Sequence, residues 1–324
     1  MKTTSIRTHF ENTGVKERTV SALALGIARF GGMEKEKENH AQLDCFLSGG
    51  GSLVDTALVY GQWVDETQQS YSELILGDYL EEADHKSKIV VSTKGAHPKL
   101  GTMQMRVTPE CIDSDIAQSL INLRTNNIDI YFLHRDDESV PVAAIMDALN
   151  RHAERGEIGL LGASNWSAHR IYEANDYCVK HHMRGFDLSQ ICFNIIRTTP
   201  KQMGDLTLVS MTDEEEALYR DMDMTIMAFT SLAGGFVSKF FNTADADIHS
   251  PYACADTFAR MRRIREVCRD ANLTPTAVTL GYLLGQDLPV IPIASMSSIA
   301  QLEDCMKCMD TALTKEQIAW IDGK

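Results

Sequence analysis

Eight short apolar runs, separated by longer amphipathic segments, constrain the fold of this 324-residue chain more than any other feature. Such alternation is typical of βα units that pair in a parallel sheet. Eight strands can close into a (β/α)8 barrel or remain an open, doubly wound sheet. The count of eight and the absence of a Gly-x-Gly-x-x-Gly motif after the first run favour the barrel. The runs lie at residues 23–28, 53–55, 89–93, 128–133, 158–163, 188–191, 225–229 and 290–293.

The segments between the runs carry signals for the beginning and end of helices. A capping hydroxyl precedes a first-turn proline at two places, and the Ser/Thr-x-x-Glu/Gln spacing of a capping box occurs at two others. Gly156 follows a helical segment where a left-handed terminator is expected. The proline-type starts are Thr108-Pro109 and Thr274-Pro275, and the predicted capping boxes are Thr212 with Glu215 and Ser298 with Gln301.

Two segments do not fit the regular βα alternation. The first twenty residues predict a short hairpin with its turn at Gly14, which could close the bottom of the barrel. About 25 residues separate the run 225–229 from a helix that begins near Ala255. Loops of this length are usually functional or disordered, so we interpret this long loop as a mobile flap over a ligand. We expect residues 1–324 to form one domain.

The charge of the chain argues against two classes of partner. Lys and Arg number 31 against 45 Asp and Glu, a formal net charge of −14, which disfavours nucleic acid and anionic membranes. No apolar run is long enough to span a bilayer, and the N-terminus lacks the apolar core of a signal peptide, so we expect a cytoplasmic protein. Cys305 and Cys308 have CxxC spacing but fall in a helical pattern, so we expect helix residues and no metal.

Polar residues that could together transfer a proton lie at the ends of three successive predicted strands or shortly after them. Barrel enzymes work at the C-terminal ends of their strands. Asp55 ends the second strand, Tyr60 follows it, Lys94 ends the third and His134 ends the fourth. A nearby ammonium favours the phenolate of a tyrosine, and Asp55 would hold that ammonium in place. Tyr60 could then exchange a proton with a carbonyl oxygen that His134 orients.

Each of these four residues also has a simpler explanation. Asp55 could cap a helix, Tyr60 could pack, Lys94 could be solvated and His134 could be a satisfied core residue. Their joint occurrence at matching strand ends favours the catalytic interpretation.

These residues lie in stretches that resemble the aldo-keto reductase superfamily across nearly the whole chain. The resemblance implies a (β/α)8 barrel, NAD(P)(H)-dependent interconversion of a carbonyl and an alcohol, and a catalytic tetrad of Asp55, Tyr60, Lys94 and His134. The matching stretches are VDTALVYG (54–61), VVSTKGA (90–96), DIYFLH (129–134), GASNW (162–166), SQICFN (189–194), AFTSLAGG (228–235) and IASMSSIAQLED (293–304).

The same resemblance implies a set of cofactor contacts. Ser164, Asn165 and Gln190 look like the residues that bind the nicotinamide carboxamide, which offers both a donor and an acceptor. Phe229 stands where the family usually has a Tyr that stacks on the nicotinamide, and stacking needs only the ring. The other contacts that the resemblance implies are Gly26, Asp55, Thr230, Leu232, Gly234, Ser295, Ser297, Ser298 and Gln301.

The last of these positions leave the choice of cofactor open. The family commonly places Lys and Arg after the eighth strand, where they bind the adenosine 2′-phosphate. This chain has Ser295, Ser297, Ser298 and Gln301 there, and none is positively charged. A helix that begins at Ser298 still offers backbone N–H groups to a phosphate. The cofactor is therefore expected to be NADP or NAD, with a relaxed preference.

The candidate substrate-binding residues are Phe30, Trp63, Arg135 and Trp166. Arg135 follows the catalytic His, where many members of the superfamily carry Trp. An Arg there fits a carboxylate or a hydroxyl-rich substrate, and it fits a solvated surface position equally well.

We therefore expect an oxidoreductase that acts on a small aldehyde, ketone or sugar-like carbonyl. A cofactor-binding regulatory subunit on the same fold is the alternative. A metal-dependent hydrolase is disfavoured because the strand ends lack a His-x-His pair and clustered carboxylates. The substrate, the direction of the reaction and the oligomeric state stay open.

Overall fold

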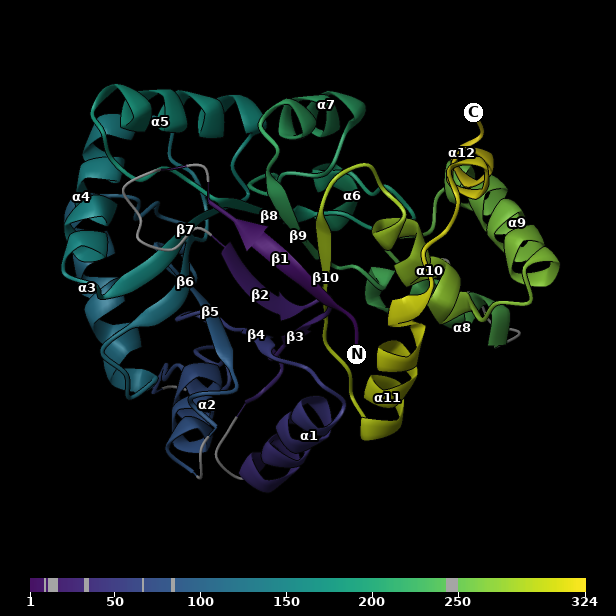
Figure 1. Cartoon of the computed structure of the whole chain (residues 1–324), viewed down its shortest axis with the longest axis horizontal. Coiled ribbons are helices and arrows are strands. Elements are labelled where there is room, and N and C mark those ends of the chain that lie inside the picture. The colour runs from purple at the N-terminus through teal and green to yellow at the C-terminus, as the bar shows by residue number, and fades with distance from the viewer. Residues whose placement is uncertain (9, 11–16, 32–34, 66, 83–84, 243–249) are drawn as a thin grey trace.

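Eight parallel strands close into a barrel in the computed structural model, which describes residues 1–8, 10, 17–31, 35–65, 67–82, 85–242 and 250–324. The order around the ring is β10-β3-β4-β5-β6-β7-β8-β9, so the last strand pairs with the first to close the barrel (Figure 1). This confirms the (β/α)8 prediction. The strands are β3 (Ala24–Gly26), β4 (Leu53–Asp55), β5 (Val90–Gly95), β6 (Ile128–Leu133), β7 (Ile158–Ser164), β8 (Leu188–Cys192), β9 (Thr225–Phe229) and β10 (Val290–Ala294).

Helices connect these strands and form the outer layer of the barrel (Figure 1). The first predicted strand, residues 23–28, is shorter in the structure, where only Ala24–Gly26 pairs as β3. The helices are α1 (Glu36–Ser48), α2 (Tyr71–Glu81), α3 (Pro109–Asn122), α4 (Val142–Glu154), α5 (Ala168–Lys180), α6 (Pro200–Met203), α7 (Asp213–Asp221), α8 (Phe236–Asn242), α9 (Ala255–Asp270), α10 (Pro275–Leu284), α11 (Ile299–Lys307) and α12 (Lys315–Asp322).

The strands separate two hydrophobic cores. In β6, Ile130 and Phe132 belong to the cluster inside the barrel, whereas Tyr131 and Leu133 belong to the cluster between strands and helices. This alternation follows from the two-residue period of a strand. Both faces of each strand are thus covered, as expected for a parallel sheet.

A two-stranded antiparallel hairpin closes the bottom of the barrel, as the sequence predicts. It consists of β1 (Thr3–Arg7) and β2 (Glu17–Ser21), and it lies across the ring of strands (Figure 1). Ile6 and Val20 are buried in the same cluster as the interior residues of the barrel. Arg18 Nη2 donates to Asp129 Oδ1 at 2.5 Å, which ties the hairpin to β6. The turn predicted at Gly14 lies outside the described residues.

Most of the predicted helix boundaries are confirmed, with two corrections. The hydroxyls of Thr108, Thr274, Thr212 and Ser298 each accept a backbone N–H of the first turn, and Gly156 has a φ of 72°. The reciprocal half of both predicted capping boxes is wrong. Glu215 Oε2 instead accepts from the backbone N of Ala168, and Gln301 Oε1 accepts from the backbone N of Ser297.

The segment after β9 is not a continuous loop. A short 3₁₀ turn (Ala233–Gly235) and α8 occupy its first part, and residues 243–249 lie outside the described residues. Phe236 and Val237 of α8 are buried, and Phe240 and Phe241 pack against the same core, a spacing of four residues that favours a helix. Its predicted role as a mobile flap stays a prediction.

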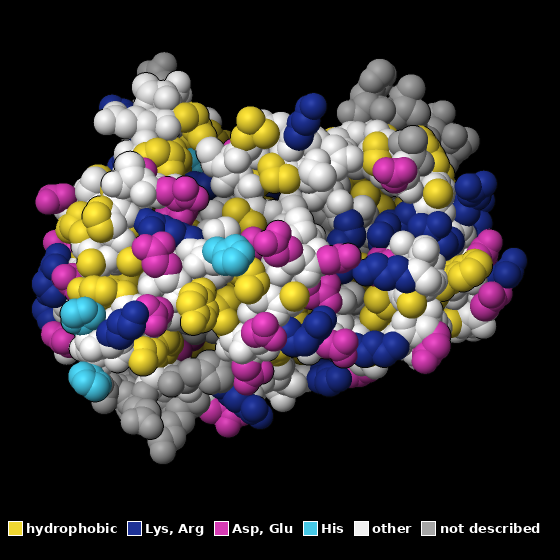
Figure 2. Space-filling view, turned by 90° about the horizontal axis from the view of Figure 1, so that it is seen from above, with side chains coloured by type: hydrophobic (Ala, Val, Ile, Leu, Met, Phe, Trp, Pro, Cys, Tyr) yellow, Lys and Arg dark blue, Asp and Glu magenta, His cyan; other side chains and the backbone are white. Residues whose placement is uncertain are grey.

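The outer surface mixes both signs of charge. Figure 2 shows basic and acidic side chains interspersed over one flank of the molecule. Within the described part of the chain, no helix is long and apolar enough to cross a membrane.

Candidate active site

A cavity of about 920 Å³ opens at the C-terminal ends of the barrel strands. Tyr60, His134 and Arg135 line it, and Lys94 is buried behind them. The expected cofactor contacts converge on this cavity with the exception of Ser298, which caps α11. Those that line it are Gly26, Asp55, Ser164, Asn165, Gln190, Phe229, Thr230, Leu232, Gly234, Ser295, Ser297 and Gln301.

The four predicted catalytic residues lie together. Lys94 Nζ donates to Asp55 Oδ2 at 2.7 Å and to the carbonyl oxygen of Thr56 at 2.7 Å. The same Nζ lies 4.9 Å from the centroid of the Tyr60 ring. The rings of Tyr60 and His134 meet edge to face, with centroids 5.6 Å apart. The ammonium and the phenol are therefore on the same side of the barrel wall, as the proposed chemistry requires.

The surroundings fix the charge of two of these groups. Burial alone would lower the pKa of Lys94, but Asp55 and Tyr60 together outweigh it and raise that pKa above its ordinary value. Lys94 therefore stays charged. Burial holds the pKa of His134 well below its ordinary value, and the charge of Lys94 adds to this effect. His134 is therefore a neutral imidazole, which can donate or accept a hydrogen bond without carrying charge.

Asp55 receives donors from two other side chains besides Lys94. Ser92 Oγ donates to Asp55 Oδ1 at 2.9 Å, and Gln190 Nε2 donates to the same oxygen at 3.0 Å. Sequence reasoning missed Ser92, although its spacing of two residues from Lys94 places both on the inner face of β5. Gln190 lies on β8, on the opposite side of the ring from β4, so this hydrogen bond crosses the barrel.

A family model described as the Aldo/keto reductase family matches residues 22–324. The chain belongs to the aldo/keto reductase family.

Several curated proteins resemble this family member along most of their length. The "Uncharacterized oxidoreductase YrpG" of Bacillus subtilis is 24% identical over 319 residues, which cover 95% of this chain and 92% of that protein. The "Aldo-keto reductase ausK" of Aspergillus calidoustus is 26% identical over 94% of this chain and 77% of its own. The "Aldo-keto reductase yakc [NADP(+)]" of Schizosaccharomyces pombe is 22% identical over 86% of this chain and 80% of its own.

Side-chain amides and a hydroxyl in this aldo/keto reductase suit a nicotinamide carboxamide. Asn165 Nδ2 donates to the carbonyl oxygen of His134 at 3.3 Å and to Ser164 Oγ at 3.1 Å. Gln190 uses its Nε2 on Asp55, and its Oε1 has no partner among the described residues. The Gln190 oxygen and the Ser164 hydroxyl thus offer an acceptor and a donor to the cavity, which fits a carboxamide.

Some of the left-handed backbone conformations lie at the cavity. Asn165 has a φ of 57°, and Thr230 has a φ of 53°, which is rare for a β-branched residue. Ala233, Gly234 and Gly235 continue the pattern after β9. Such conformations cost free energy and persist at sites where the surrounding structure requires them. Thr230 and Gly234 both line the cavity.

The cavity lining includes charged residues that the resemblance to the superfamily does not predict. Asp304 joins Ser297 and Gln301 in the lining, which adds a negative charge beside positions where the resemblance leads us to expect a 2′-phosphate. Arg29 and Lys239 also line the cavity, and sequence reasoning missed both. Arg29 follows β3 closely, so the rule that strand ends carry function could have found it.

Three of the four expected substrate contacts are not in the cavity lining. Phe30 is buried in the outer core, and Trp63 is exposed with its ring centroid 6.0 Å from that of Tyr60. Trp166 is fully buried, and its Nε1 donates to the carbonyl oxygen of Arg135 at 3.1 Å. Trp166 therefore supports the chain behind Arg135, which is the one of the four that lines the cavity.

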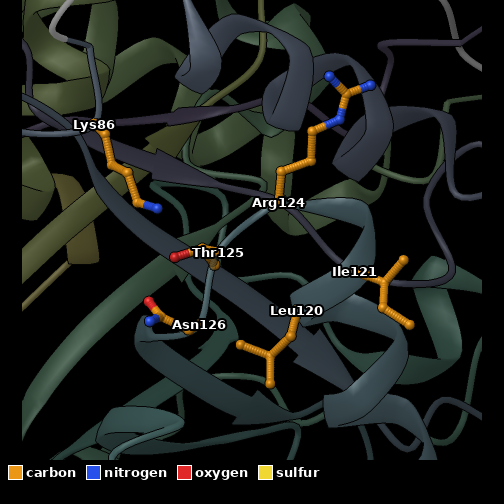
Figure 3. Close-up of a pocket in the computed structure, with 6 residues that line it drawn as sticks. All are labelled: Lys86, Leu120, Ile121, Arg124, Thr125 and Asn126. Carbon is orange, nitrogen blue, oxygen red and sulfur yellow. The ribbon is translucent and has the colours of Figure 1, made fainter.

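Two other features lie apart from this cavity. A surface hollow of about 440 Å³ is lined by Lys86, Leu120, Ile121, Arg124, Thr125 and Asn126, close to the N-terminal ends of β5 and β6. Lys86 extends towards Thr125 and Asn126, whereas Arg124 and Ile121 point away (Figure 3). Arg124 pairs with Asp78 and Glu81. Glu36, His40 and Glu82 have ligand atoms within 4.8 Å of one another, but they lie outside the cavity lining.

Proposed function

We propose that this protein is an NAD(P)(H)-dependent oxidoreductase that interconverts a small carbonyl compound and an alcohol, with Tyr60 as the acid and base. The observation that carries the proposal is the buried Lys94 ammonium, held at 2.7 Å by Asp55 and 4.9 Å from the Tyr60 ring. A cation beside a phenol favours the phenolate, so it eases proton exchange at Tyr60.

A bound nicotinamide would supply or accept the hydride. Ser164, Asn165 and Gln190 are the residues that would hold its carboxamide, and Phe229 offers a ring for stacking. The left-handed turn after β9 also lines the cavity, and its backbone N–H groups other than those of Ala233 and Gly235, which donate within the turn, can face a phosphate. These residues would orient the cofactor and exclude water from the reacting carbon.

Each of the four predicted catalytic residues has a separate role in the transfer of the proton. Tyr60 gives its proton to the carbonyl oxygen during reduction and takes it back during oxidation. Lys94 stabilises the phenolate that remains, and Asp55 keeps Lys94 in position. His134, which is neutral, donates a hydrogen bond to the same oxygen and so fixes the orientation of the substrate.

The test is steady-state turnover of the wild-type protein and of Tyr60→Phe with a panel of aldehydes, ketones and sugars. Tyr60→Phe keeps the ring and removes the hydroxyl, so we expect turnover to fall by roughly a hundredfold to ten-thousandfold, the usual contribution of a general acid. Cofactor affinity should be nearly unchanged. Tight cofactor binding without turnover of any substrate by the wild-type protein would support a regulatory subunit instead.

We further propose that the protein accepts both NADH and NADPH. Ser295, Ser297, Ser298 and Gln301, the expected 2′-phosphate positions after β10, carry no positive charge, and Asp304 lines the cavity together with three of them, whereas the positive side chains Arg29 and Lys239 come from other segments of the chain. Fluorescence titration with both cofactors should give affinities within roughly tenfold of each other, since charge-assisted contacts to the 2′-phosphate are weakened. A preference above a thousandfold for either cofactor would overturn this part of the proposal.

A further inference from the structure

Arg135 lines the cavity directly after His134, at the end of β6. It is not a solvated surface group, because only 9% of its side chain is exposed. Burial of a guanidinium is costly unless hydrogen bonds and opposite charge offset it. The partners of Arg135 therefore determine which of its N–H groups remain for a ligand.

Three contacts hold the guanidinium. Nε donates to Thr207 Oγ1 at 2.9 Å, Nη1 to the carbonyl oxygen of His134 at 2.8 Å and Nη2 to Asp205 Oδ2 at 3.2 Å. An arginine has five N–H groups, so one N–H on each Nη has no acceptor among the described residues. Two N–H groups in one plane match the two oxygens of a carboxylate.

Asp205 positions Arg135 without fully neutralising it. The 3.2 Å separation is longer than a typical charge-assisted hydrogen bond, and 32% of the Asp205 side chain is exposed. The other carboxylate oxygen of Asp205 accepts from the backbone N and the hydroxyl of Thr207. Burial alone would raise the pKa of Asp205, but these hydrogen bonds and the charge of Arg135 lower it.

The other groups that face Arg135 add no net charge beside it. His134 is neutral, and the ring of His97 lies against it with centroids 4.7 Å apart. Burial lowers the pKa of His97, and the charge of Arg135 adds to this effect, so His97 adds no charge at neutral pH. Lys94 and Asp55 compensate each other. The feature that can attract an anion here is therefore the pair of Arg135 N–H groups that Asp205, Thr207 and His134 do not engage, although the chain as a whole carries a net charge of −14.

We propose that the substrate is a carbonyl compound that also carries a carboxylate, which the two remaining N–H groups of Arg135 bind. This inference rests on the proposed function. The carbonyl group gains a hydride at carbon from NAD(P)H, which becomes NAD(P)⁺, and a proton at oxygen through Tyr60. The carboxylate is unchanged, and the product is a hydroxy acid.

The experiment compares two probes that differ in charge, 4-carboxybenzaldehyde and its methyl ester. For the wild-type protein we expect kcat/KM to favour the carboxylate by on the order of tenfold to a hundredfold, the range of a charge-assisted pair. Arg135→Gln should bring the ratio close to one, because KM for the carboxylate should rise more than KM for the ester. Arg135→Lys should give an intermediate ratio, because it keeps the charge and loses the planar pair of donors.

Arg269→Gln serves as the matched control. It removes one positive charge from an exposed site whose partner is Asp270, so both kcat/KM values should stay unchanged. Circular dichroism and thermal melting show whether each variant is folded, and Arg135→Lys keeps the test decisive if Arg135→Gln does not fold. A wild-type ratio near one, or a ratio unaffected in both Arg135 variants, overturns the inference and leaves the proposed function standing. Failure to turn over either probe or any other carbonyl overturns the proposed function itself.

Discussion

The interior of the barrel holds a charged pair, Lys94 and Asp55, where apolar side chains would give a simpler core. The two groups are almost fully buried and lie 2.7 Å apart. A buried ion pair contributes little to stability on average, because the cost of desolvation offsets the attraction between the charges. This arrangement is therefore better explained by the chemistry at Tyr60 than by the stability of the fold.

Removal of one member of this pair should be costly. Lys94→Met leaves Asp55 buried without its cation, so we expect the free energy of unfolding to fall by about 3–5 kcal/mol. The double variant Asp55→Asn with Lys94→Met should recover part of that loss, because neither buried charge remains. Urea denaturation measures the free energy of unfolding of the single and the double variant. A loss below about 1 kcal/mol in the single variant would contradict the prediction.

The neutral state of His134 predicts a pH dependence of stability. Its pKa is held well below the ordinary value by burial first, and by the charges of Lys94 and Arg135 as well. Below about pH 6.5 the unfolded chain binds a proton at this imidazole and the folded protein does not, so stability falls as pH falls, by up to about 1.4 kcal/mol per pH unit.

His134→Gln removes this effect. Its free energy of unfolding, measured by chemical denaturation from pH 7.5 to pH 5, should fall less steeply than that of the wild-type protein. His97, whose pKa is also lowered, is present in both proteins and contributes to both curves. Parallel curves for the two proteins would show that His134 titrates normally in the folded state.

At the scale of single residues, the sequence predicts which residues lie at the ends of strands. It does not predict the direction in which their side chains point. Asp55, Lys94 and His134 were found because each ends a strand. Trp166 was expected in the cavity, but Asn165 before it has left-handed backbone and changes the direction of the chain. The Trp166 ring then packs against Phe186, with centroids 5.2 Å apart. No periodicity in the sequence signals such a change.

Among the elements, the N-terminal hairpin shows what pattern alone can predict. Its existence follows from the sequence, and its role follows from the burial of Ile6 and Val20 among the interior barrel residues. The segment after β9 was expected to be a loop, because its glycines and its length obscure the short apolar face of α8. Phe236 and Val237 supply that face.

The hairpin should stabilise the barrel without taking part in the reaction. Ile6 is fully buried, so Ile6→Ala should lower the free energy of unfolding by about 2–5 kcal/mol. Thr3→Ala, at an exposed position of the same strand, should change it by less than about 0.5 kcal/mol. Because the hairpin lies at the end opposite the cavity, kcat of folded Ile6→Ala should equal that of the wild-type protein.

On the scale of the whole molecule, the number of strands predicted the barrel, but its closure rests on contacts distant in sequence. β10 pairs with β3, and Ser295 Oγ donates to the carbonyl oxygen of Gly26 at 2.5 Å across 269 positions. A Cβ at Gly26 would lie 2.8 Å from Ile293 Cγ2 and from Ser295 Oγ, so this contact needs glycine. The local sequence patterns that predict single strands do not show that β10 pairs with β3.

A closed ring predicts cooperative unfolding of residues 1–324 as one domain. The loss of any strand exposes two unpaired edges, so partial unfolding should be unfavourable. Scanning calorimetry should give a single transition, with a calorimetric enthalpy close to the van't Hoff enthalpy. Two resolved transitions would show that part of the chain folds independently.

The hydrogen bond from Gln190 to Asp55 joins opposite sides of the ring, and the same carboxylate holds Lys94. A barrel of larger diameter would stretch the hydrogen bond between Gln190 and Asp55. It would thereby displace the Lys94 ammonium from its place beside Tyr60. Relatives that evolve to accept bulkier substrates should therefore keep the diameter of the barrel. Their sequences should differ mainly in the loops that follow the C-terminal ends of the strands. The segment that carries Asp205 and Thr207 is one such loop, so selectivity can drift there while the chemistry is conserved.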